Sequence, residues 1–244
     1  MHSGFALIVD RIDYLIMVPL LYVSILALLA GIIWRIAVIM RSPPPPYPLR
    51  LYPAARRPGL AALGDAFAMP QVRKHKPLFW VFLMIYHLAF VLLVLGHLDI
   101  LPRINLLPAD SRHMLGAGGV GIAVTLPLIY FLLRRLRPPQ RDISVLSDYL
   151  LLLLLLFLFL FGDMMSWGNS WSAHGFVMTK QDFSRYFDGL ARFTFTDPRT
   201  VLPGSHYHFV VIHVLLAEIF FVVLPFSKII HTFFSIPVNL LRRR

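Results

Sequence analysis

The sequence predicts an all-α integral membrane protein, a bundle of five transmembrane helices with its N-terminus outside and its C-terminus in the cytoplasm. Three observations support this prediction. Of the 244 residues, 58% are hydrophobic and 14% are charged, which is too little charge for a soluble domain of this size. Apolar segments of bilayer length recur along the chain. Basic residues gather in alternate connections between those segments.

Five apolar segments form the predicted spans. They are residues 14–34, 78–98, 114–133, 149–162 and 209–230. The fourth is short, although residues 143–146 extend it. The first is not a cleaved signal peptide, because Asp10 and Asp13 precede it and no Ala-x-Ala site follows it.

The distribution of charge orients the bundle. Residues 35–77 carry eight Lys and Arg residues against one Asp, and the connection at 134–148 and the C-terminal tail are also basic. These three parts sum to +13, whereas the N-terminus and the other two connections sum to −1. The positive-inside rule therefore places the C-terminus in the cytoplasm. The net charge of +11 is concentrated in the connections that are predicted to be cytoplasmic. We therefore attribute this charge to membrane topology and expect no nucleic-acid partner.

The chain is expected to form a single membrane-embedded domain over residues 1–244. Residues 43–77 are predicted to be a cytoplasmic connection, in which PPPPYP is a stiff spacer and GLAALGDAFAMP a short helix on the cytoplasmic face. Residues 163–207 form the long outer loop. Its Trp167 and Trp171 either anchor the chain at the interface or cover a ligand site.

Four histidines lie in two of the predicted spans. His87 and His97 are in the second span, and His213 and His231 are in the fifth. Burying an imidazole without a partner costs on the order of a few kcal/mol, so these side chains require partners. The two spans run in opposite directions. His97 is therefore predicted at the depth of His213, near the outer face, and His87 at the depth of His231, nearer the cytoplasm.

Two such pairs suit two b-type haems. Neutral imidazoles on facing helices are suitable axial ligands for a planar metal porphyrin. Zinc would require three or four clustered ligands. The chain has no cysteine, which excludes thiolate zinc sites, Cys-ligated iron–sulfur clusters and covalent c-type haem.

The two histidines of the second span are closer together along the helix axis than the two of the fifth span. Eighteen residues make five helical turns, so His213 and His231 would share one face of a continuous helix. Ten residues rise about 15 Å and eighteen about 27 Å. The helices must therefore tilt or bend, and Pro225 provides a place to bend.

Two further residues have more than one interpretation. Glu218 is the one acid inside a predicted span. It relays protons, bonds to a polar group on a neighbouring helix, or is simply a neutral hydrogen-bonded acid. Gly96, beside His97, either lets a haem or quinone approach the backbone closely or ends the helix.

These motifs together resemble a known family. They are YHLAFVLLVLGH at residues 86–97, the spacing from His213 to His231 that ends in PFSKIIH and is followed by SIPV, and AGG at residues 117–119. The chain resembles the gamma subunit of respiratory nitrate reductase. This di-haem cytochrome b family also includes the membrane cytochromes of heterodisulfide reductase and of sulfate-reducer redox complexes.

The resemblance implies ligands and a direction of electron flow. It assigns His97 and His213 to the outer haem, and His87 and His231 to the inner haem. It implies that menaquinol is oxidised near the outer haem of a protein in the prokaryotic cytoplasmic membrane. Electrons then pass to a cytoplasmic iron–sulfur subunit, which fits a chain without cysteine.

One departure from the family concerns the quinol site. A lysine that helps to hold the quinol precedes AGG in nitrate reductases, and Asp110 stands there in this chain. Asp110, Arg112 and His113 are therefore the candidate quinol residues. The long first connection suggests a different docking partner, and the outer loop would tolerate a periplasmic multihaem cytochrome. The terminal complex and the direction of electron flow stay open.

Two rival functions belong to other classes. One is a haem-free membrane anchor or assembly subunit of such a complex. The other is a histidine-based metal transporter, which would need acidic residues along a path, and only Glu218 is placed for that role.

Overall fold

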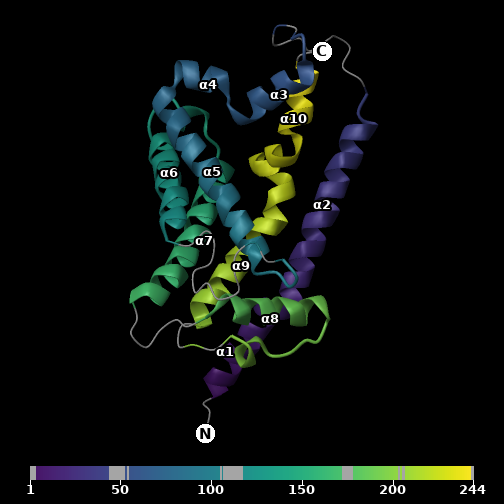
Figure 1. Ribbon diagram of the computed structural model, residues 1–244, viewed down its shortest axis with the longest axis vertical. Coiled ribbons are helices and arrows are strands. Elements are labelled where there is room, and N and C mark those ends of the chain that lie inside the picture. Colours follow the sequence, from purple (N-terminus) through teal and green to yellow (C-terminus); the bar gives the residue numbers. More distant parts are fainter. Residues whose placement is uncertain are drawn as a thin grey trace. The chain divides into compact units, whose positions relative to one another are not determined.

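The computed structural model describes residues 4–43, 53, 55–104, 106, 118–171, 178–202, 204 and 207–242, and the regular structure of these residues is entirely helical (Figure 1). The prediction of an all-α protein is confirmed. The elements are α1 (Gly4–Leu15), η1 (Ile16–Leu20), α2 (Leu21–Arg41), α3 (Pro58–Phe67), α4 (Pro70–His75), α5 (Pro77–Asp99), α6 (Gly119–Arg135), η2 (Arg141–Ile143), α7 (Leu146–Trp171), α8 (Lys180–Ala191), η3 (Pro198–Thr200), α9 (Tyr207–Val223), η4 (Leu224–Phe226), η5 (Lys228–Ile230) and α10 (His231–Leu241).

Four helical stretches of the described chain are long and apolar enough to cross a membrane. They are Ala6–Arg41, Pro77–Asp99, Leu146–Trp167 and Tyr207–Phe226. They overlap the first, second, fourth and fifth predicted spans, so the chain is a multi-pass membrane protein. The third predicted span overlaps α6, a helix of 17 residues with Pro127 inside it. The count of five spans and the orientation of the termini stay predictions.

Proline shapes two of the spans. Pro19 lies within η1, a π-helical turn between α1 and α2, because a residue without an N–H group disturbs the regular hydrogen-bond ladder. Pro225 lies within η4, where α9 has ended. The helix is interrupted at Pro225, the position where the sequence predicts a bend.

That break corrects one prediction made from the sequence. The interval from His213 to His231 is not one continuous helix, because η4 and η5 separate α9 from α10. Counting five turns of an unbroken helix therefore does not place the two histidines on a common face. The break is stabilised locally by Ser227, whose hydroxyl oxygen accepts a hydrogen bond from the backbone N–H of Ile229 at 3.2 Å.

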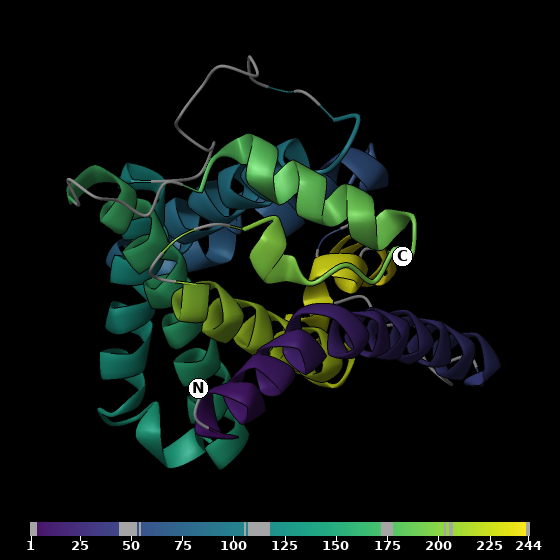
Figure 2. The ribbon, with the colours of Figure 1, turned by 90° about the horizontal axis from the view of Figure 1, so that it is seen from below.

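The chain divides into two compact units. The first comprises Met1–Ile25 and Ile85–Phe220, and the second comprises Leu26–Met84 and Phe221–Arg244. In the first unit, α8 runs crosswise to the long helices α7 and α9 (Figures 1 and 2).

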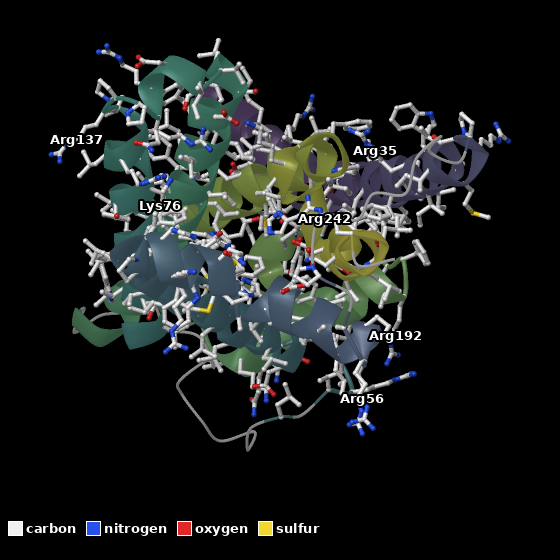
Figure 3. The ribbon with its side chains drawn as sticks, turned by 90° about the horizontal axis from the view of Figure 1, so that it is seen from above. Arg35, Arg56, Lys76, Arg137, Arg192 and Arg242 are labelled. Carbon is white, nitrogen blue, oxygen red and sulfur yellow. The ribbon has the colours of Figure 1, made fainter. Side chains whose placement is uncertain are left out.

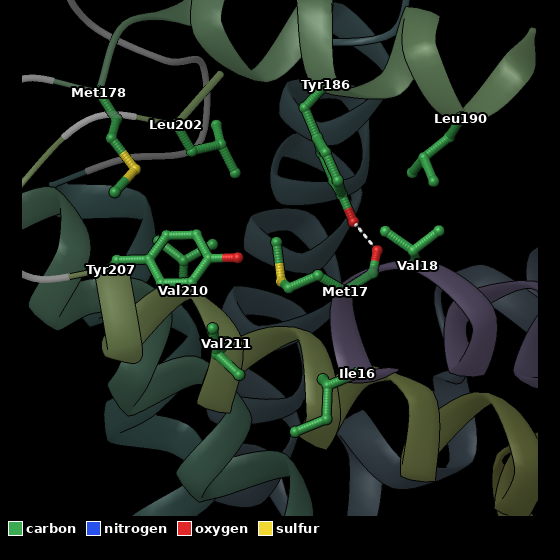
Figure 4. Packing of buried hydrophobic residues seen from close by; sticks show 10 residues of the cluster. All are labelled: Ile16, Met17, Val18, Met178, Tyr186, Leu190, Leu202, Tyr207, Val210 and Val211. Carbon is green, nitrogen blue, oxygen red and sulfur yellow. Dashed lines mark hydrogen bonds between the residues drawn. The ribbon is translucent and has the colours of Figure 1, made fainter. Parts of the chain in front are cut away.

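The core of the first unit forms where η1, α8 and α9 meet. Its buried residues are Ile16, Met17, Val18, Met178, Tyr186, Leu190, Leu202, Tyr207, Val210 and Val211 (Figure 4). The Tyr186 hydroxyl donates a hydrogen bond to the Met17 carbonyl, and Tyr22 donates one to the Leu190 carbonyl at 2.6 Å. Burial is the main cause that raises the pKa of Tyr186, which keeps this phenol neutral and able to donate.

A second contact in this unit joins α6 to α7. The Thr125 hydroxyl donates to the buried carboxylate of Asp163 at 2.9 Å. A Cβ atom at Gly121 would overlap that carboxylate, so glycine is required there for the acid to fit. Because α7 continues to Trp171, Asp163 lies inside a span. The prediction that Glu218 is the one acid inside a span is therefore wrong.

The second unit contains the predicted short helix of the first connection. GLAALGDAFAMP does contain a helix, α3, which packs against α10 and buries Ala62 completely. Arg35 donates to the Pro225 carbonyl at 3.1 Å. Basic side chains lie near the helix ends of this unit, and Figure 3 labels Arg56, Lys76 and Arg242 among them.

Candidate functional site

His97 and His213 lie close together in the first unit, with nearly parallel ring planes. His97 is in the last turn of α5, and His213 is in the second turn of α9. The ring centroids are 6.2 Å apart and the ring planes differ by 21°. The structure thus brings together the two histidines that the sequence predicts at the same depth.

The hydrogen bonds of the two rings determine which nitrogen can bind a metal. His97 Nδ1 lies 2.8 Å from the Leu93 carbonyl oxygen, and His213 Nδ1 lies 3.0 Å from the Leu158 carbonyl oxygen. A carbonyl oxygen only accepts hydrogen bonds, so each Nδ1 must carry the proton. In the neutral ring, Nε2 then keeps its lone pair. This is the tautomer in which a histidine binds a metal through Nε2 while Nδ1 holds the ring in position.

This donor set suits a planar metal cofactor. Metal–nitrogen bonds of about 2 Å on both sides of one ion place two imidazole centres roughly 6 Å apart. Across the described ranges, no group of three or more His, Cys, Asp or Glu side chains is placed to hold a metal ion. Two facing imidazoles can provide only two ligands, and a porphyrin provides the remaining four itself.

Helix α7 contacts the His213 ring through Leu158 and Gly162. Leu158 and Gly162 are one turn apart, so they lie on the same face of that helix. A Cβ atom at position 162 would lie 3.2 Å from His213 Cε1 and 3.5 Å from Nδ1. Sequence reasoning missed this role, although a single glycine following a run of Leu and Phe was a detectable signal.

His87 and His231 are held in different units. His87 belongs to the first unit, is half-buried on α5, and lies edge-on to Tyr86 with ring centroids 5.5 Å apart. His231 belongs to the second unit, begins α10, and has its Nδ1 2.9 Å from the Lys228 carbonyl oxygen. The pairing of these two residues stays a prediction.

The remaining predicted residues have different outcomes. Gly96 is buried one residue before His97. Asp110, Arg112 and His113 lie outside the described residues, so the quinol site stays a prediction. Glu218 is buried in α9, with 2% of its surface exposed.

A buried ion pair lies just beyond His97. Lys180 Nζ, at the start of α8, is 2.9 Å from Asp99 Oδ2, at the end of α5, and the two side chains are 6% and 1% exposed. Asp99 also accepts a hydrogen bond from the Leu106 backbone N–H at 2.6 Å. This pair ties α8 to α5, the helix that carries His97. No sequence pattern indicated it.

A partly exposed charged cluster, centred on the buried side chain of Asp13, lies on the same unit. Arg199 pairs with Asp10 and with Asp13, each at 2.8 Å, and His208 Nδ1 is 3.3 Å from Asp13. The hydrogen bond that Arg199 donates to Asp13 is the main cause that raises the pKa of Arg199.

Comparison with known proteins agrees with this arrangement. The family model described as nitrate reductase gamma subunit matches residues 69–244, which include all four histidines. The chain belongs to this family. The resemblance found from the histidine spacing is thereby confirmed. A search of curated proteins gave no match. This nitrate reductase gamma family member is a multi-pass membrane protein and a membrane subunit of a redox complex.

Proposed function

We propose that this protein is a di-haem cytochrome b, which passes electrons between the quinone pool and a cytoplasmic iron–sulfur subunit. The observation that supports this proposal best is the His97–His213 pair. Its ring separation, its nearly parallel planes and the bonded state of both Nδ1 atoms suit two axial ligands of one iron.

In this proposal, each haem has two histidine ligands. His97 and His213 bind the outer haem, and His87 and His231 bind the inner haem. The haems provide one-electron chemistry when bound. The chain itself fixes the ligand rings through the Leu93 and Leu158 carbonyl groups, leaves space at Gly162, and excludes water with the apolar side chains of its spans.

The proposal also specifies topology and partners. Five spans cross the prokaryotic cytoplasmic membrane with the N-terminus outside. Menaquinol is oxidised at the outer side near Asp110, Arg112 and His113, and its protons are released there. The catalytic and iron–sulfur subunits bind on the cytoplasmic side, where the charge count places the basic connections. A periplasmic multihaem cytochrome is the proposed partner of the outer loop.

Histidine replacement tests the pairing directly. We expect His97→Ala and His213→Ala each to lower the haem content from two to one and to remove the same spectral component. His87→Ala and His231→Ala should remove the other component. His208→Ala is the matched control, because this exposed histidine also lies on α9 but bonds to Asp13. Loss of one shared component in the His87 and His97 variants would contradict the pairing.

A second replacement tests the quinol site. We expect Asp110→Asn to slow haem reduction by a menaquinol analogue about tenfold or more while both haems stay bound, because the side chain loses its ability to accept a quinol proton. Stopped-flow absorbance measures the rate, and reduction by dithionite is the control. An unchanged rate with quinol would place the site elsewhere.

A further inference from the structure

Glu218 is buried without the bonds that such a group normally makes. Among the residues that the structure describes, neither of its carboxylate oxygens has a hydrogen-bond partner, and the described ion pairs do not include it. More than nine in ten buried polar groups in proteins are hydrogen-bonded. Its position in α9 therefore needs an explanation other than a structural bond.

One phenol on another helix, that of Tyr186, interacts electrostatically with Glu218. Positions 207, 211 and 218 recur at helical spacing on α9, which places Glu218 on the face that packs against η1. Burial first, and then the charges of Tyr207, Glu218 and Tyr22, raise the pKa of Tyr186 on α8. Tyr186 is thus a titratable neighbour of Glu218, and Tyr207 and Tyr22 are in turn titratable neighbours of Tyr186. The Tyr207 hydroxyl, which points into the cluster, also lacks a partner within the described part of the chain (Figure 4).

In these apolar surroundings, the protonation state of Glu218 depends on the charge of nearby groups. An unpaired carboxylate anion in apolar surroundings is much less favourable than the neutral acid. Glu218 follows His213 by five residues, which is about 7.5 Å along the helix axis and about 140° around it, so the two side chains lie on different sides of α9. Charges at such a separation interact strongly where water is excluded. The extra positive charge of an oxidised iron beside His213 would favour the anion, and its loss on reduction would favour the acid.

We propose that Glu218 is a proton-binding site coupled to the electron on the outer haem, an inference that rests on the proposed function. When bound between His97 and His213, the outer haem would supply one-electron chemistry, with menaquinol as the reductant. Glu218 then takes one proton from water on the outer side, and an O–H bond forms on its carboxylate. When the electron leaves for the inner haem, that O–H bond breaks and the proton returns to water. Charge in the apolar interior is balanced in both states.

Redox-induced infrared difference spectroscopy on the full-chain protein, purified with its haems, tests this proposal. On reduction, we expect the wild type to gain a carboxylic acid C=O band that shifts in D2O. The midpoint potential of the outer haem should fall as pH rises. Glu218→Gln, which is similar in shape, should lose the band and most of the pH dependence. Asp163→Asn is the matched control. It removes another buried carboxyl group, which Thr125 already satisfies, and should leave both signals in place.

The outcomes separate this inference from the proposed function. Wild-type protein without haem would overturn both. Wild-type protein with two quinol-reducible haems, but without the band or the pH dependence, would overturn the inference alone. The inference is also overturned if the band disappears in Asp163→Asn and persists in Glu218→Gln. If Glu218→Gln does not fold, Glu218→Asp serves instead. This variant keeps an acid on a shorter stem and should shift the band, whereas an unshifted band would contradict the assignment.

Discussion

At the scale of single residues, the orientation of His97 and His213 follows from backbone carbonyl groups. Leu93 lies one turn before His97 on the same helix, whereas Leu158 reaches His213 from α7. Both bonds leave Nε2 as the ligand atom. Gly162 completes the arrangement, because the His213 ring occupies the space that a side chain there would fill.

The role of Gly162 gives a prediction at this scale. We expect Gly162→Val to displace the His213 ring and to lower the haem content from about two to about one per chain, because the new Cβ begins 3.2 Å from the ring and carries two further methyl groups. Pyridine haemochrome absorbance per polypeptide measures this change. Gly119→Val is the control, because among the described residues no atom outside its chain neighbours and its own helix backbone lies within 4 Å of its Cβ position. Equal haem contents in the two variants would contradict the proposal that Gly162 leaves space for the His213 ring.

Sequence alone predicted part of this residue-scale arrangement. The spacing of four histidines and the opposite directions of two spans predicted that His97 and His213 would meet. Leu158 and Gly162 were not predicted to contribute, because their roles depend on contacts with residues far away in the chain. Leu158 and His213 are 55 positions apart, and no local periodicity encodes such a contact.

At the scale of elements, helix α8 is held over the unit by a few specific bonds. Its first residue, Lys180, pairs with Asp99, and Tyr186 in its middle bonds to Met17. Thr179 and Asp182 form a capping box that fixes the start of the helix. These bonds therefore hold α8 close to the end of α5 that carries His97.

Replacing Lys180 tests this attachment. We expect Lys180→Met to lower the free energy of unfolding by about 3–5 kcal/mol, because the Asp99 carboxylate is left buried without its charged partner. Thermal unfolding in detergent measures the loss. Combining Lys180→Met with Asp99→Asn should recover much of it, because the amide oxygen can still accept from Leu106 N–H.

Arg192→Met provides the matched control for this experiment. Arg192 pairs with Asp188 on the same helix at a similar distance, but both side chains are exposed, so little stability should be lost. Equal losses in the Lys180 and Arg192 variants would show that burial does not strengthen the Lys180 attachment.

At the scale of the whole molecule, hydropathy predicted the fold class and most of the spans. Four of the five predicted segments coincide with helices long enough to cross a membrane. Hydropathy did not reveal that helices end at Val223 and begin again at His231, because apolar residues continue through the break. Pro225 marked the position of the break. The sequence predicted a bend there, whereas the structure shows that the helix is interrupted.

The family match agrees with the molecular picture at this scale. It covers residues 69–244, from α4 onward, and includes both histidine-bearing helices. The first span, Ala6–Arg41, lies outside the matched range. Membership supports an electron-transfer role for the bundle, and the two proposed haems give that role a physical basis.

A haem count on the purified protein, followed by a reduced-minus-oxidised spectrum after addition of a menaquinol analogue, tests the central claim most directly. The proposal predicts about two b-type haems per chain, both reduced by the quinol. Carefully prepared protein without haem would contradict it, and would instead support a haem-free membrane anchor that keeps the four histidines for structure.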